Sequence, residues 1–121
     1  VTEDNRDFRR VIHTGHHLQL VLMSLLPGED IGEETHATHD QFFRIEKGKG
    51  IVSIDGVESK VGKNAAIVVP AGTQHNIINT GDKPMRLYTL YAPPQHREGF
   101  VAATRDLADA SSETFQEAAE P

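Results

Sequence analysis

Histidine is the residue type in this chain that is best suited to chemistry. The 121 residues include seven histidines and no cysteine, so imidazole and carboxylate groups are the main side chains available to hold a metal ion. His36, His39 and His75 lie close in sequence to glycine, acidic or amide residues, which makes them the candidates for a metal site. A cysteine-based zinc site, a disulfide scaffold and a cysteine nucleophile are excluded. The other histidines are expected at the surface or mouth of the domain: His13, His16, His17 and His96.

Short strands must position these side chains, because turn signals recur at short intervals with no helical pattern between them. Residues 18–26 form an apolar run that ends at Pro27-Gly28, and Asp55-Gly56 is a strong signal for a tight β-hairpin. The tip of that hairpin is expected to lie far from the candidate site. Strands are expected at residues 18–26, 30–36, 41–45, 50–54, 57–61, 65–69, 75–78 and 86–91.

This spacing predicts an all-β domain, an antiparallel sandwich or barrel, over residues 18–94. Residues 1–17 are expected to form an N-terminal arm that could add an edge strand. Residues 95–121 are expected to form a C-terminal tail in which Thr104 caps a short helix. The end of the tail, residues 111–121, is expected to be frayed or disordered.

The composition excludes several classes of function. The net charge is −6, and no basic stripe of the kind that nucleic-acid binding needs is present. No apolar run approaches the length of a membrane span, and the first residues are charged, so no secretory signal is expected in them. The absence of cysteine fits a cytoplasmic protein. We therefore expect a cytoplasmic protein whose partner is a small molecule and neither a nucleic acid nor a membrane.

Two segments around the candidate histidines resemble the two sequence motifs of the cupin superfamily. The first motif is matched at its spacings by Gly28, Glu34, His36, Gln41 and Gly48. The second is matched by Pro70-Ala71-Gly72 and then by His75 and Asn79, while Asn64 stands where this motif usually opens on glycine. The resemblance covers residues 18–92. It is strongest to small single-domain cupins with a His-x-x-x-x-Gln-Phe-Phe segment, which are described as mannose-6-phosphate-isomerase-like.

The resemblance implies a double-stranded β-helix, or jelly-roll barrel, that holds one divalent metal ion. The four positions that are usually three histidines and a glutamate hold Glu34, His36, Gln41 and His75 in this chain. His39 lies in the turn between two of these positions and could substitute for Glu34. The ion is expected to be manganese, iron, zinc or nickel.

Strand geometry supports this arrangement, because residues two apart in a strand face the same side. Glu34 and His36 therefore point the same way, and Gln41 can return to them from the next strand. Phe43 and Ile45 share the parity of Gln41 and are expected to face inward.

Two functions are compatible with such a site. The first is a metal-dependent enzyme, with isomerase-, lyase- or dioxygenase-like chemistry on a small polar or anionic molecule. The second is a non-catalytic module that binds a small molecule at the same ion. A homodimer is expected in either case, because an exposed edge strand of a small barrel favours pairing with a second copy.

Overall fold

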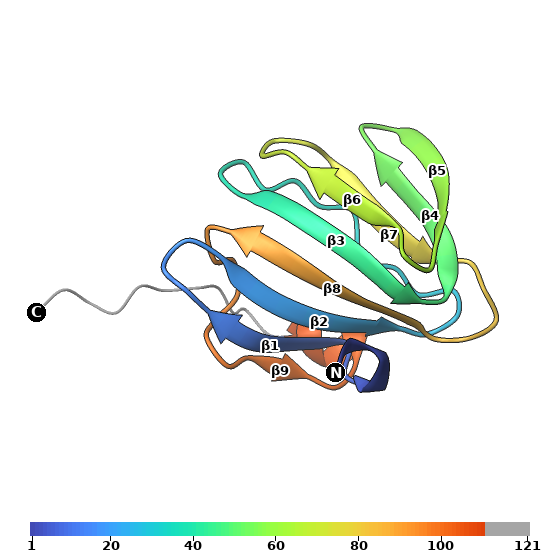
Figure 1. Ribbon diagram of the computed structural model, residues 1–121, viewed down its shortest axis with the longest axis horizontal. Helices are drawn as coiled ribbons and strands as arrows, with labels where there is room; N and C mark the ends of the chain where they lie inside the picture. The colour runs from blue at the N-terminus through green and yellow to red at the C-terminus, as the bar shows by residue number, and fades with distance from the viewer. Residues whose placement is uncertain (111–121) are drawn as a thin grey trace, which may run out of the picture.

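Two antiparallel β-sheets make up most of the computed structural model, which describes residues 1–110 (Figure 1). The strands are β1 (Arg9–Thr14), β2 (Gln19–Leu25), β3 (Asp40–Lys47), β4 (Lys49–Ile54), β5 (Val57–Gly62), β6 (Ala66–Val69), β7 (His75–Asn79), β8 (Met85–Ala92) and β9 (Val101–Ala102). The helical elements are a short 3₁₀ turn, η1 (Thr2–Asp4), and one short helix, α1 (Arg105–Ala110).

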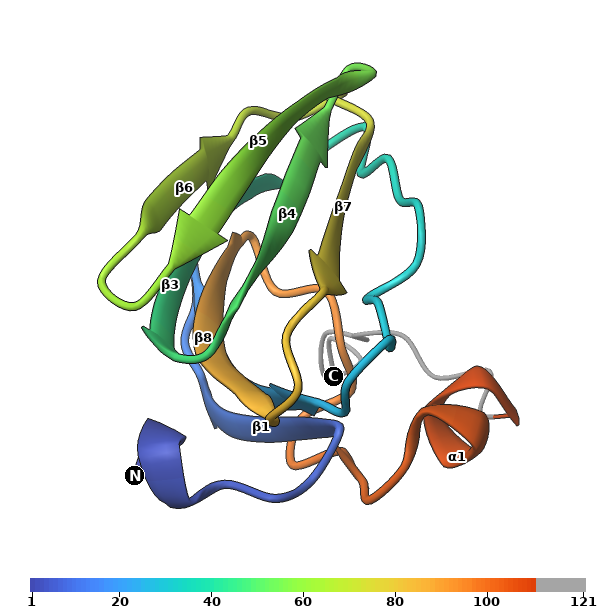
Figure 2. The same ribbon diagram turned by 90° about the vertical axis from the view of Figure 1, so that its right-hand side faces the viewer.

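The strands are arranged as the double-stranded β-helix that the resemblance of the motifs implies. One sheet has the order β6-β3-β8-β2-β1-β9 and the other has the order β5-β4-β7. The two sheets face each other and enclose the core (Figure 2). The connection from β2 to β3 runs beside β7, where two isolated bridges join Asp30 to Ile78 and Glu34 to His75. This connection brings the first motif against the second.

The expected strands form, with one difference. Residues 30–36, which were expected to be a strand, pair with β7 only at the two bridges and are otherwise irregular. Pairing is interrupted there because Gly32 has a φ of 91° and leaves the extended conformation. Residues of the expected arm form β1, which pairs with β2, and residues of the expected tail form β9, which pairs with β1.

The core lies between the two sheets and is formed by the inward-facing side chains, which alternate with outward-facing ones along each strand. Gln41, Phe43 and Ile45 of β3 are buried, and the last two are 0% exposed, as the parity of the strand predicts. On β8, every second residue is buried from Met85 to Tyr91. The polar Gln41 thus lies on the same inner surface as the apolar core.

Two turns place residues in the left-handed region of backbone conformation, and one of them explains why asparagine can stand in for the usual glycine of the second motif. Asp55 and Gly56 both have positive φ angles, 49° and 82°, as a two-residue hairpin turn requires. Asn64, which replaces the usual glycine, has a φ of 72°, and asparagine tolerates this left-handed conformation better than most residues. The hairpin tip, however, does not lie far from the site: Asp55 exchanges hydrogen bonds with Gln74 of 2.8 and 3.1 Å.

The C-terminal helix begins as the sequence predicts. The hydroxyl of Thr104 accepts a hydrogen bond of 3.2 Å from the Leu107 amide, which caps α1. Arg105 at the start of α1 forms an ion pair with Asp30 in the β2–β3 connection. The predicted disorder concerns residues 111–121, which lie outside the described residues. No helix among residues 1–110 has both the length and the apolar character that a membrane span needs.

Candidate metal centre

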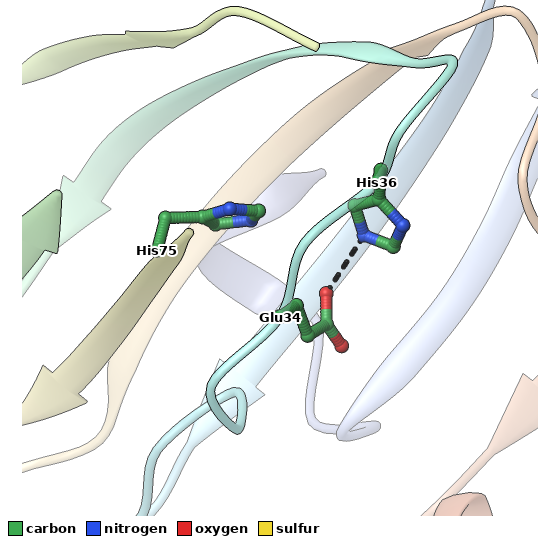
Figure 3. A group of neighbouring side chains, drawn as sticks. All are labelled: Glu34, His36 and His75. Carbon is green, nitrogen blue, oxygen red and sulfur yellow. Dashed lines mark hydrogen bonds and ion pairs between the residues drawn. The ribbon is translucent and has the colours of Figure 1, made fainter. Parts of the chain in front are cut away.

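The backbone brings together two of the predicted ligand residues. Glu34 and His75 are linked by a pair of backbone hydrogen bonds, each 2.9 Å long, in which each amide donates to the carbonyl of the other residue. His36 follows two residues later and faces the same way as Glu34 (Figure 3). One ligand atom from each of Glu34, His36 and His75 lies within 4.8 Å of the others.

Glu34 and His36 already form a polar pair. The Nε2–H of His36 donates a hydrogen bond of 2.9 Å to Oε2 of Glu34. Burial raises the pKa of the Glu34 carboxyl, but this hydrogen bond and the electrostatic attraction of His36, Arg9 and His75 outweigh it and lower the pKa below its ordinary value. Glu34 is therefore ionised at neutral pH, as a metal ligand must be.

His75 is held in the tautomer that a metal ligand needs. Its Nδ1–H donates a hydrogen bond of 3.0 Å to the carbonyl of Thr73, so Nε2 keeps its lone pair. The side chain is 1% exposed, and Nε2 is buried without a hydrogen-bond partner among the described residues. A buried ring nitrogen in this state costs free energy unless something binds to it.

Gln41 presents a second unpaired acceptor. Its amide nitrogen donates a hydrogen bond of 2.9 Å to the hydroxyl of Thr89, which leaves Oε1 as the free end. Within residues 1–110, no donor reaches this buried oxygen.

The donor set fits a divalent ion. Imidazole nitrogens suit first-row transition metals, and carboxylate or amide oxygens complete mixed sites of this kind. The 2.9 Å between Oε2 of Glu34 and Nε2 of His36 is close to the separation of about 3 Å between two ligands that stand at right angles, each about 2.1 Å from an ion. Such an ion would take the place of the proton that now lies between the two atoms.

His39 is placed apart from this cluster. Its Nε2–H donates a hydrogen bond of 3.1 Å to the carbonyl of Pro94. The ring packs edge-on against His36 at a centroid distance of 5.9 Å. Of the two alternatives, Glu34 is therefore the residue that lies beside His36 and His75. The hydrogen bond of His39 instead links its turn to the segment that follows β8.

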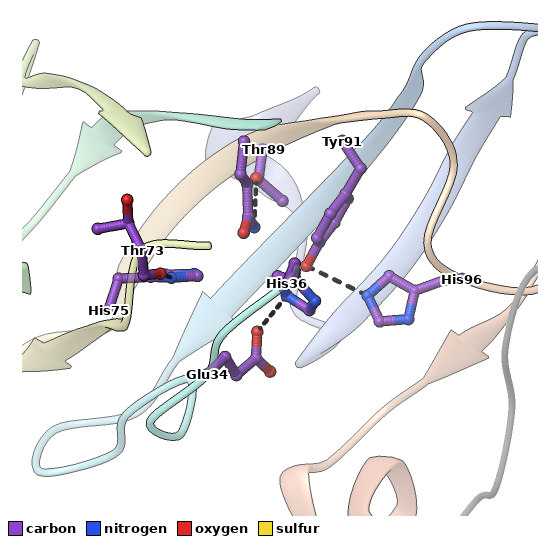
Figure 4. A network of polar contacts seen from close by, with 8 residues as sticks. Glu34, His36, Thr73, His75, Thr89, Tyr91 and His96 are labelled. Carbon is purple, nitrogen blue, oxygen red and sulfur yellow. Dashed lines mark hydrogen bonds and ion pairs between the residues drawn. The ribbon is translucent and has the colours of Figure 1, made fainter. Parts of the chain in front are cut away.

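Two residues that the sequence analysis missed lie beside the cluster. Tyr91 is 1% exposed, packs edge-on against His36 at 5.7 Å, and is hydrogen-bonded to His96 at 3.2 Å (Figure 4). The expectation that His96 lies at the surface or mouth is wrong, because this side chain is 7% exposed. Its backbone amide donates to Oε1 of Gln19, which fixes the residue inside.

The two residues differ in how far the sequence could have revealed them. Tyr91 shares its parity with the buried Leu87 and Thr89 of β8, so its inward position could have been read from the strand. His96 follows Pro93-Pro94 in an irregular segment, where no periodicity indicates its direction. The remaining histidines that received no role are exposed: His13, His16 and His17.

Comparison with known proteins agrees with the fold and the motifs. The sequence profile of the cupin domain matches residues 21–91, and the chain belongs to the cupin family. It is 48% identical over 118 residues to YrkC of Bacillus subtilis, an uncharacterised protein, covering 93% of this chain and 63% of that one. It is 43% identical over 115 residues to an uncharacterised protein of Acanthamoeba polyphaga mimivirus, covering 91% and 71% of the two chains.

A solved structure is similar over nearly the whole length. A crystal structure of a Bacillus halodurans protein superposes with a TM-score of 0.89 at 47% identity, covering 91% of this chain and 88% of that one. The chain spans 63% of the length of the Bacillus subtilis relative, so that protein contains a further part that this chain does not match.

Proposed function

We propose that this cupin holds one divalent ion with Glu34, His36, His75 and the amide oxygen of Gln41, and that the ion binds a small polar or anionic molecule. The observation that carries the proposal is the pair of buried acceptors, Nε2 of His75 and Oε1 of Gln41, without partners in the described part of the chain. Each such atom costs about 1–3 kcal/mol when it stays unpaired. A bound cation would satisfy both.

The ion would supply Lewis-acid chemistry, polarising a carbonyl, carboxylate or enol oxygen, and dioxygen chemistry in addition if it is iron or manganese. The mixed nitrogen and oxygen ligands suit manganese, iron, zinc or nickel. The residues around it prepare the site: Thr73 orients His75, and Thr89 orients Gln41 so that its oxygen remains free.

The polar pair of Tyr91 and His96 favours an enzyme over a purely binding module. A phenol beside His36 can hold or release a proton at its oxygen, and His96 is within hydrogen-bond distance to exchange it. Isomerase- and lyase-like reactions need such a group.

We further propose that the protein acts as a cytoplasmic homodimer, as the sequence predicts. An apolar stripe crosses the outer face of the six-stranded sheet and supports the dimer. The stripe, which we call the outer stripe, consists of cross-strand neighbours in β6, β3, β8 and β2: Val68, Phe42, Leu90 and Leu20. Val68 is 67% exposed. A two-fold axis through this face would bury the same stripe on both copies.

The experiment that tests the function starts from the metal. The purified protein is dialysed against manganese, iron, zinc and nickel in turn, and the bound metal is measured by elemental analysis. The loaded protein is then screened against pools of keto acids, phosphosugars and catechols. Turnover supports the enzyme, whereas thermal stabilisation without turnover supports the binding module. No bound metal at neutral pH would contradict the proposal.

A further inference from the structure

Two of the proposed ligands lie where the pairing of the backbone is interrupted. The β2–β3 connection, which carries Glu34 and His36, meets β7 at two isolated bridges, one at Asp30 and one at Glu34. Between the bridges, Gly32 has a φ of 91° and departs from the extended conformation. Side chains that fasten the connection at this interruption are therefore in a position to set how firmly the two ligands are held.

The carboxylate of Asp30 joins three segments at this interruption. Its Oδ2 accepts a hydrogen bond of 2.9 Å from the amide nitrogen of Asn76, the residue that follows His75 in β7. Its Oδ1 accepts a hydrogen bond from Nη1 of Arg105, the first residue of α1. The carboxylate thus fastens the connection both to β7 and to α1.

Arg105 reaches the connection from α1, which lies on the same side of the barrel (Figure 2). Besides the bond to Asp30, its Nη2 lies 3.5 Å from the point at which a β-carbon on Gly32 would stand. Its Nε lies 3.5 Å from Oδ2 of Asp109, one turn further along the helix, which holds the guanidinium. The guanidinium therefore lies beside the backbone at the interruption, between the two bridges to β7.

We infer that Arg105 is a positioning residue for the proposed metal site and that it acts through Asp30. This inference rests on the proposed function. By fastening the connection to α1, the ion pair holds Glu34 and His36 close to the positions in which they would contact the ion. Ligands that are already in place lose less conformational freedom on binding, so the affinity for the ion is higher. Residues that support metal ligands in this way typically contribute a factor of about 10–100 to the affinity.

Charge and position predict opposite results for this ion pair. If charge alone mattered, removal of the positive Arg105 would strengthen cation binding, removal of the negative Asp30 would weaken it, and the two effects would nearly cancel. If Arg105 acts through Asp30, either change releases the same contact, so each weakens binding and the double change weakens it no further. A double-mutant cycle on metal affinity therefore distinguishes the two explanations.

The test measures zinc affinity by competition with a chromogenic chelator. The proteins are the wild type, Arg105→Met, Asp30→Asn, the double variant and Arg105→Lys. Arg10→Met is the matched control, because Arg10 also pairs with an aspartate, Asp7 at 3.1 Å, but away from the connection. Urea unfolding of the zinc-free proteins measures their stability separately. All of them are expected to fold, since the side chains of the ion pair are 31% and 27% exposed.

Arg105→Met and Asp30→Asn are each expected to bind zinc at least about tenfold more weakly than the wild type, and the double variant should match them. Arg105→Lys should recover part of the loss, because a lysine can still pair with Asp30 as a point charge. Arg10→Met should bind zinc as the wild type does.

Several results would overturn the inference. Zinc affinity that is unchanged or higher in Arg105→Met would do so, and so would a double variant that binds like the wild type, which is the result that charge alone predicts. Equal losses in Arg105→Met and Arg10→Met would show a general effect of surface charge and not positioning. A lower free energy of unfolding with unchanged zinc affinity would leave the ion pair a structural role only. A wild type that binds none of the divalent ions would instead overturn the proposed function, and this inference with it.

Discussion

A single backbone carbonyl decides what His75 can do. Because the Thr73 carbonyl accepts the hydrogen bond from Nδ1–H, the other ring nitrogen, Nε2, is a buried acceptor without a partner among the described residues. Glu34 is ionised beside it. The two residues are far apart in the sequence, one in the β2–β3 connection and the other at the start of β7, and the fold brings them together. The chemistry of the site thus depends on the tautomer of one ring.

Replacing His75 by alanine is expected to remove the metal. Loss of a ligand should weaken binding by at least about a hundredfold, because changes to mere supporting residues already cost 10–100-fold. The apo protein should still fold, since apolar strands form the core, but it should melt somewhat lower than the wild type because a buried ring and its hydrogen bond to Thr73 are lost. Elemental analysis after dialysis and a melting curve check both points.

His13→Ala is the matched control for this substitution. His13 is exposed on β1, so its loss should leave both metal content and melting unchanged. His96 is unsuitable as a control because it is buried against Tyr91. Full metal content in His75→Ala would remove the basis of the proposed site.

At this scale the sequence predicts the positions of the ligands better than their surroundings. Motif spacing predicts that Glu34, His36 and His75 come together, and the structure brings one ligand atom of each within 4.8 Å of the others, because the strands and turns that carry them are short and well marked. It says nothing of His96, whose approach depends on how the segment after β8 packs, whereas the inward position of Tyr91 follows from the parity of β8. Such contacts between distant segments have no signal in local periodicity.

The β4–β5 hairpin connects the fold to the site at the scale of elements. Its turn residue Gly56 has a φ of 82°, and the neighbouring Asp55 holds Gln74, which precedes His75. Gly56→Val should lower the free energy of unfolding by about 1–3 kcal/mol, because a β-branched residue resists this conformation. Gly56→Asn should lose less, since asparagine tolerates positive φ. Urea unfolding distinguishes the two variants, and equal losses would contradict the assignment.

The ion pair between the β2–β3 connection and α1 predicts a pH dependence. Burial raises the pKa of Asp30, but the hydrogen bonds from Asn76 and Arg105 and the charge of Arg105 outweigh it and lower the pKa. The carboxylate therefore stabilises the fold above its unfolded-state pKa, and this contribution is lost as the pH falls through the lowered folded-state pKa.

Comparison with Asp30→Asn isolates this contribution. At pH 7 the variant should be less stable than the wild type by about 1 kcal/mol, the upper range for a partly exposed pair. The difference should shrink below about pH 4 and vanish once the wild-type carboxyl is protonated. Urea unfolding at pH 7, 5 and 3 measures it. A difference that stayed constant over this range would contradict the assignment.

Among the elements, the sequence predicts the β4–β5 hairpin correctly but predicts a strand over residues 30–36 of the β2–β3 connection, where the backbone is irregular. Asp55-Gly56 fixes its turn through local backbone preference. Residues 30–36 have the composition of a polar strand, but the positive φ of Gly32 and the contact of Arg105 with Asp30 hold them in an irregular path. The second contact comes from a helix 75 residues away, so no window of sequence contains it.

At the scale of the whole molecule, we expect that one charged residue introduced into the outer stripe dissociates the proposed dimer. Val68→Lys should convert the expected dimer to a monomer at micromolar concentration, because burying a valine contributes about 1.5–3 kcal/mol and each dimer buries two. Val57→Lys on β5 is the control, since Val57 is equally exposed, at 68% against 67%, but lies outside the stripe. Sedimentation velocity measures both, and a monomeric wild type would contradict the dimer.

The two backbone hydrogen bonds between Glu34 and His75 make amide hydrogen exchange at these residues a measure of metal binding. Each amide is tied to the carbonyl of the other residue, so neither can exchange its hydrogen with heavy water unless the two segments separate. An ion that links their side chains would hold the segments together and slow both exchanges by the same factor. The rate of amide exchange at these two positions would therefore report how much of the site is occupied by any metal, including ions that give no optical or magnetic-resonance signal.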